Sequence, residues 1–113
     1  MSTYRDLTVW QKSIDLVVLV YRFTARFPTQ EQYGLTSQMR RAAVSIPSNI
    51  AEGSRRRGKD IRHFLIIAFA SGSEMETQLE VSKRLEFGDK ILRVEAEKLL
   101  DEVMRMLNKM INV

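Results

Sequence analysis

The sequence predicts an all-α protein, folded as a single up-down-up-down four-helix bundle over residues 1–113. Apolar residues recur every three or four positions in four successive segments, which is the spacing of one helix face. Short stretches with glycine, proline or an N-capping residue separate these segments. No alternating run of β-branched residues indicates a strand. A chain of 113 residues can bury one core without disulfides or a metal.

The first helix is expected to begin near Asp6 or Thr8 and to end before Pro28. Thr8, with Gln11 three residues later, has the form of a capping box. Residues 16–20 are apolar nearly all round the helix, so a second interface is expected to cover part of this surface. The expected core stripe is Trp10, Ile14, Val17 and Tyr21.

The second helix is expected from Thr36 or Ser37 to about Gly53, which would serve as its C-terminal glycine. Pro47 lies inside it and removes a backbone hydrogen bond, so the sequence predicts a proline-kinked helix or a break into two segments. Its apolar stripe is Met39, Ala42, Ala43, Ile46 and Ile50. A polar stripe, which could be either a solvated face or a hydrogen-bonded seam between helices or subunits, comprises Arg41, Ser45, Ser48 and Glu52.

The third helix is expected from Asp60 to about Phe87, and Gly72 in its core stripe predicts a close approach of another helix. Gly88 should end this helix and Asp89 should cap the fourth. Residues 64–70 are again apolar on every side, which favours a homo-oligomer. The expected stripe of the third helix is Ile61, Leu65, Ala68, Gly72, Met75, Leu79 and Ser82. That of the fourth is Leu92, Ala96, Leu99, Val103, Met106 and Met110.

Composition excludes several classes of protein. The chain has no cysteine and one histidine, so thiol catalysis, disulfides and a multi-histidine metal site are excluded, and a cytoplasmic location is expected. The N-terminus does not resemble a secretion signal, and no apolar run approaches the roughly 20 residues that cross a bilayer. Neither a membrane partner nor a cofactor is expected.

No motif of enzymatic chemistry is present. The sequence lacks GxGxxG, GxxxxGK[ST], HExxH and GxSxG. Glu74 and Glu76 point to different helix faces, and the Glu-x-x-His motifs of a di-iron bundle are missing. We therefore expect no catalytic residues, no metal ligands and no enzyme activity.

The basic residues are unevenly distributed. Residues 1–63 carry 11 Lys and Arg against 5 Asp and Glu, whereas residues 64–113 carry 7 against 9. Such asymmetry predicts either a polyanionic partner or a charged assembly surface. Arginine forks suit phosphate oxygens, and the N-terminus of the third helix would add N–H donors. No aromatic residue lies between Thr36 and His63, so backbone recognition is expected rather than base stacking. The candidate nucleic-acid-binding residues are Arg40, Arg41, Arg55, Arg56, Arg57, Lys59 and Arg62.

The chain resembles the bacterial four-helix-bundle family associated with intervening sequences of 23S rRNA genes. The segment Gln38 to Gly53 (QMRRAAVSIPSNIAEG) carries the most specific part of the match. Ala70 and Phe87 depart from the family pattern, where glycine and tyrosine are common. The remaining matching residues are Trp10, Lys12, Tyr21, Phe27, Pro28, Glu31, Gly34, Leu35, Phe64, Leu65, Ala68, Ser71 and Glu74 to Leu79.

The resemblance implies a bundle that assembles into a ring-like homopentamer. The chain also looks distantly like the pentameric accessory proteins of diversity-generating retroelements, which are linked to a reverse transcriptase and its RNA. The leading hypothesis is a non-catalytic homo-oligomeric bundle that binds structured RNA through the basic residues. The alternative hypothesis is an assembly scaffold that recruits a protein partner such as a reverse transcriptase, with the arginines serving subunit contacts.

Overall fold

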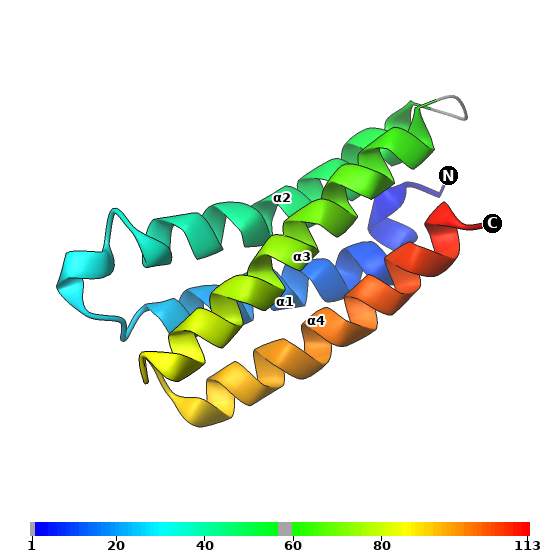
Figure 1. The fold of residues 1–113 in the computed structure, drawn as a ribbon. Helices are drawn as coiled ribbons and strands as arrows, with labels where there is room; N and C mark the ends of the chain where they lie inside the picture. The colour runs from blue at the N-terminus through cyan, green and yellow to red at the C-terminus, as the bar shows by residue number, and fades with distance from the viewer. Residues whose placement is uncertain (1, 57–59) are drawn as a thin grey trace.

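Four long α-helices make up most of the structure, a computed structural model that describes residues 2–56 and 60–113. The helices are α1 (Thr8–Thr24), α2 (Leu35–Arg55), α3 (Ile61–Arg84) and α4 (Lys90–Ile111), with short 3-10 helices η1 (Tyr4–Asp6) and η2 (Thr29–Glu31). Each long helix packs on its neighbour in the chain, and α4 closes against α1. The result is an elongated four-helix bundle of 43 × 24 × 24 Å (Figure 1).

The two ends of the bundle carry different parts of the chain. Both termini, the end of α2 and the start of α3 gather at one end, whereas the connections after α1 and after α3 lie at the other (Figure 1). Tyr4 therefore lies close to Arg55, and Arg62 lies close to Ile111, although the members of each pair are far apart in the sequence.

The capping box expected at Thr8 is wrong. A capping box forms instead at Thr3, at the start of η1. The Thr3 hydroxyl accepts from the N–H of Arg5 at 3.2 Å, and the Thr3 N–H donates to Asp6 Oδ2 at 3.0 Å. This box closes η1, and α1 follows with Thr8 as its first residue and no side-chain cap. Gln11 instead donates to the carbonyl of Arg5 at 2.9 Å.

The buried face of α1 is rotated from the predicted stripe. Tyr21 is 42% exposed, while Trp10 and Val17 only flank the core. Buried Ser13 and Thr24 donate to the carbonyls of Trp10 and Val20 at 2.7 and 2.8 Å, so polar residues occupy the core side without unpaired hydroxyls. The buried set is Val9, Ser13, Leu16, Val20, Phe23 and Thr24.

The α2 helix is continuous across Pro47, so the expected break into two segments is wrong, and the kink stays a prediction. Its predicted apolar stripe is confirmed, since Met39, Ala43 and Ile46 are fully buried. Gly53 does not end the helix but lies inside it. A Cβ on Gly53 would stand 3.0 Å from Phe64 Cβ and 3.2 Å from the Ile61 carbonyl oxygen. This glycine therefore lets the start of α3 approach α2 closely.

The predicted stripe of α3 is confirmed from Leu65 to Ser82, with Gln78 buried in addition and Ile61 packed at the margin. A Cβ on Gly72 would collide with the Met104 sulfur, so α4 makes the close approach that this glycine predicted. The helix ends at Arg84, earlier than expected. Glu86 takes φ 58°, and the Phe87 N–H returns to the Ser82 carbonyl at 2.9 Å, as in a Schellman motif.

Asp89 caps α4 as predicted, because its Oδ1 accepts from the N–H groups of Ile91 and Leu92 at 2.7 and 3.2 Å. Only two of the six residues in the predicted stripe are buried. Ala96 and Val103 are buried, but Leu92, Leu99, Met106 and Met110 flank the core. The centre of the buried face is Ala96, Leu100, Val103 and Leu107.

Candidate nucleic-acid interface

Four arginines from three elements gather at the end of the bundle that holds both termini. Arg55 and Arg56 end α2, Arg62 lies in the first turn of α3, and Arg5 lies in η1. All four are exposed. We call this surface the basic end. The predicted site residues Arg57 and Lys59 lie outside the described residues.

Aromatic rings from the N-terminal segment hold two of these arginines in place. The Arg55 guanidinium lies 5.3 Å from the Tyr4 ring centroid, and the Arg5 guanidinium lies 5.5 Å from Tyr4 and 5.6 Å from Trp10. Tyr4 and Trp10 pack edge to face at 5.2 Å. Cation–π contacts restrict guanidinium motion without neutralising the charge, so both arginines keep their positive charge for a ligand.

Arg56 and Arg62 have polar partners on the protein. Arg56 Nη2 pairs with Glu52 Oε1 at 2.9 Å, and its guanidinium lies 5.2 Å from the Phe64 ring. Arg62 Nε donates to the Ile111 carbonyl at 3.2 Å, where it faces the negative end of the α4 dipole. The Glu52 pair is half exposed and is therefore weak, on the order of 0.5 kcal/mol. A phosphate could replace the carboxylate at little cost.

The N-terminus of α3 faces the same end. Asp60 takes the N-cap position, but its side chain accepts no hydrogen bond from the helix. The first N–H groups of α3 are thus left without a side-chain cap, which favours an anion beside Arg62. His63 is exposed and packs its edge on Phe64 at 5.2 Å.

Arg40 and Arg41 are not part of the basic end. Fifteen positions of helix between Arg40 and Arg55 correspond to about 22 Å along α2. The Arg40 guanidinium lies 4.5 Å from the Tyr21 ring, and its Nε donates to the Thr24 hydroxyl at 2.9 Å. The predicted site residues that the structure describes therefore form two groups. One group, at the basic end, is Arg55, Arg56 and Arg62. The other group, towards the opposite end of the bundle, is Arg40 and Arg41.

The sequence missed two features of the basic end. Arg5 lies far from the central segment, and no local pattern connects the two. The aromatic rings were missed for the same reason, because Tyr4 and Trp10 come from the N-terminal segment and only Phe64 adjoins the basic stretch. Although positions 36–63 contain no aromatic residue, aromatic rings from other segments lie at the basic end.

The polar stripe of α2 combines both interpretations made from the sequence. Ser45 is half-buried, and its hydroxyl accepts from Ser71 of α3 at 2.8 Å and from Asn49 at 3.0 Å. Arg41 and Ser48 are exposed. The stripe is thus a hydrogen-bonded seam between α2 and α3 at Ser45 and a solvated face elsewhere.

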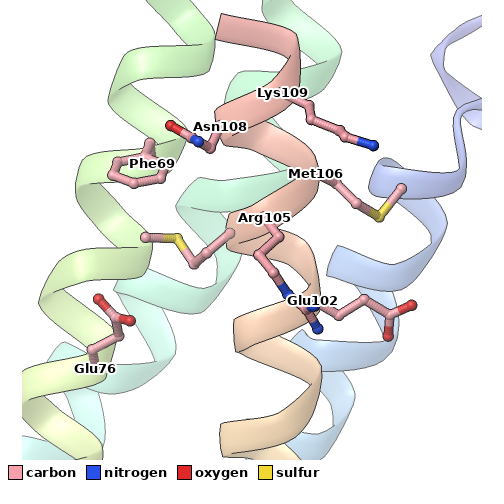
Figure 2. A pocket seen from close by; sticks show the side chains of 8 residues that line it. Phe69, Glu76, Glu102, Arg105, Met106, Asn108 and Lys109 are labelled. Atoms are coloured by element: carbon pink, nitrogen blue, oxygen red, sulfur yellow. The ribbon is translucent and has the colours of Figure 1, made fainter. Parts of the chain in front are cut away.

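A hollow of about 830 Å³ opens between α3 and α4, and Figure 2 shows its lining side chains. Glu76, Glu102, Arg105 and Lys109 give the lining of this hollow both charge signs. In residues 2–56 and 60–113, no group of three His, Cys, Asp or Glu side chains is arranged to hold a metal ion. Over the same residues, no helix has the length and apolar character needed to span a membrane.

Comparisons with known proteins agree with the fold. A protein of unknown function from the S23 ribosomal protein family of Bacteroides thetaiotaomicron has a crystal structure with a TM-score of 0.82 and 24% identity to this chain, covering 94% of this chain and 100% of that one. At this identity the likeness establishes the fold alone. No curated protein matches the chain. The sequence model of the 23S rRNA-intervening sequence protein family matches residues 5–109. The chain therefore belongs to the 23S rRNA-intervening sequence protein family.

Proposed function

We propose that this protein is a non-catalytic, homo-oligomeric helical bundle that binds structured RNA through phosphate contacts at its basic end. The observation that carries the proposal is that three separate elements place exposed arginines, Arg5, Arg55, Arg56 and Arg62, at the same end of the bundle. The family description refers to 23S rRNA, which supports an rRNA-associated ligand and hence a cytoplasmic location.

The chemistry of the basic end suits a nucleic-acid backbone. A guanidinium donates two parallel hydrogen bonds to phosphate oxygens, and Arg5 and Arg55 have no carboxylate among their described contacts. The neighbouring N-terminus of α3 adds backbone donors and a positive dipole end. Phosphate contacts of this kind follow the shape of a folded RNA rather than its sequence.

A salt titration tests the proposal. If four arginines each neutralise one phosphate, log affinity should fall with log salt with a slope of about −3.6, or roughly 100-fold between 50 and 200 mM. Filter binding of a structured rRNA fragment to the purified protein measures this slope. Affinity that is absent, or that does not change with salt, would contradict the proposal.

The homo-oligomeric part of the proposal is supported by apolar residues that the single chain leaves uncovered. Val18 is 46% exposed and Ile66 is 42% exposed. Val18 and Ile66 lie in the two segments that the sequence marks as apolar all round. Native mass spectrometry should show a homopentamer, with about five times the 13.1 kDa mass of one chain. A monomer at micromolar concentration would contradict this part of the proposal.

The hollow between α3 and α4 favours a second candidate function, a scaffold that recruits a protein such as a reverse transcriptase. Met104, Met106 and Phe69 line it, and methionine-rich surfaces adapt well to protein partners. Affinity capture from the native host, with and without ribonuclease, separates the two functions. A specific protein retained after ribonuclease treatment, with no RNA captured before it, would favour the scaffold.

A further inference from the structure

A second hollow lies between α1 and α2, away from the basic end, and its lining is free of negative charge. Its volume is about 650 Å³, within the usual range of small-ligand sites. Among the described residues that line it there is no Asp or Glu, whereas the hollow between α3 and α4 contains Glu76 and Glu102. This hollow therefore favours an anionic ligand. Its lining residues are Tyr21, Gln32, Tyr33, Thr36, Ser37, Arg40, Arg41, Val44 and Ser45.

Two tyrosines give this hollow flat apolar surfaces. Tyr33 is 90% exposed, which is unusual for an aromatic ring and leaves it free to stack on a ligand. Tyr21 is 42% exposed, and its ring is covered by the Arg40 guanidinium at 4.5 Å. The combination of an open aromatic ring with guanidinium groups is the one by which proteins hold unpaired bases.

The two arginines of the hollow have different roles. Arg40 is held by the Thr24 hydroxyl at 2.9 Å and by the Tyr21 carbonyl at 3.4 Å, so its charge is fixed in position beside the hollow. Arg41 is exposed and can turn towards a phosphate. Ser37 and Gln32 add a hydroxyl and an amide that can meet polar edges of a base.

We propose that this hollow binds one unpaired nucleotide of the RNA, with the base stacked on Tyr33 and the phosphate contacted by Arg41. The inference rests on the proposed RNA-binding function and deepens it, because it requires the RNA to offer a single-stranded residue in addition to the backbone held by the basic end. Arg40 supplies a fixed positive charge beside the phosphate.

The three tyrosines of the chain allow both surfaces to be observed in one experiment, since Tyr21 and Tyr33 line the hollow and Tyr4 lies at the basic end. The protein is labelled on tyrosine, and NMR spectra are recorded during titration with a single-stranded RNA hexamer or with a blunt RNA duplex. The hexamer should shift the Tyr33 signal upfield, as stacking requires, together with that of Tyr21. The duplex should shift only Tyr4.

Substitution of Tyr33 provides the second measurement. Tyr33→Ala should weaken hexamer binding by roughly 10-fold, whereas Tyr33→Phe, which keeps the ring, should bind as the unchanged protein does. Because Tyr33 is nearly fully exposed, neither variant should alter the helical circular dichroism spectrum.

The outcomes separate the two proposals. A hexamer that leaves the Tyr33 signal unmoved, or that binds Tyr33→Ala as tightly as the unchanged protein, overturns the nucleotide site. If the duplex still shifts Tyr4 in that case, RNA binding at the basic end stands. A hexamer that shifts Tyr33 while the duplex shifts nothing supports the nucleotide site and overturns binding at the basic end.

Discussion

Gly88→Ala is expected to destabilise the bundle by about 3 kcal/mol. Gly88 takes φ 76°, a conformation that an L-residue adopts at a cost. Its Cβ would also stand 2.5 Å from Phe23 Cε1 and 2.9 Å from Phe27 Cε1. Phe23 is fully buried, so its ring cannot turn away without disturbing the core. Urea unfolding followed by circular dichroism measures the loss.

Glu86→Gly, in the same turn, is the matched control and should have the opposite sign. Glu86 also has positive φ, at 58°, but its side chain is exposed, so only backbone strain opposes it. Removing that strain should stabilise the protein by about 0.5 kcal/mol after the extra freedom of glycine in the unfolded chain is subtracted. A Gly88→Ala variant that unfolds at the same urea concentration as the unchanged protein would show that the turn and the Phe23 packing differ from those described.

The sequence predicts the buried face of a helix correctly only where the apolar residues lie on one side of that helix. In α3, Gly72 and Ser82 break the apolar surroundings and fix one seam, and that seam is observed from Leu65 onward. In α1, residues 16–20 are apolar in every direction, so periodicity fits several faces equally well. Ser13 and Thr24 have the polar side chains expected of a solvent-facing side, yet both are buried. Each can be buried because its hydroxyl donates to a backbone carbonyl.

Gly53 shows a second limit on what the sequence alone can predict, the position at which a helix ends. A glycine near the end of a helical pattern is typical of a C-terminal cap, and only the position of α3 reveals that Gly53 instead makes room for Phe64 and Ile61. The same close packing brings the start of α3 against the end of α2. It is therefore one reason that Arg62 joins Arg55 and Arg56.

The candidate interface could be predicted in part, because chain proximity identifies Arg55, Arg56 and Arg62 but not their neighbours in space. Arg40 and Arg41 are near these residues in sequence, yet the rise of an intact helix separates them by about 22 Å. Arg5 is distant in sequence and arrives through the packing of η1 and α1 on α2. The first error follows from the continuity of α2, and the second from tertiary packing, which neighbouring positions in a single sequence do not encode.

The triple variant Arg55→Ala, Arg56→Ala, Arg62→Ala is expected to weaken binding of a structured rRNA fragment by roughly 100-fold at 0.15 M salt. Each phosphate contact that is lost no longer releases counterions from the RNA on binding. The slope of log affinity against log salt should therefore become shallower by about 3. The three side chains are exposed, and their contacts with Tyr4, Glu52 and Ile111 are surface contacts of small energy. The fold should survive, which circular dichroism can verify.

The matched control is Arg22→Ala, Arg84→Ala, Arg105→Ala, which removes the same charge from exposed positions outside the basic end. Arg84 pairs with Glu80 at 2.9 Å, just as Arg56 pairs with Glu52, and that hydrogen bond lowers the pKa of Glu80. The two variants thus remove the same charge from different places, and Arg84 matches Arg56 in its local ion pair. If RNA is held by the basic end, the control should change affinity by less than about 10-fold, through long-range attraction alone. Equal losses in both variants would mean that net charge, and not this surface, attracts the RNA.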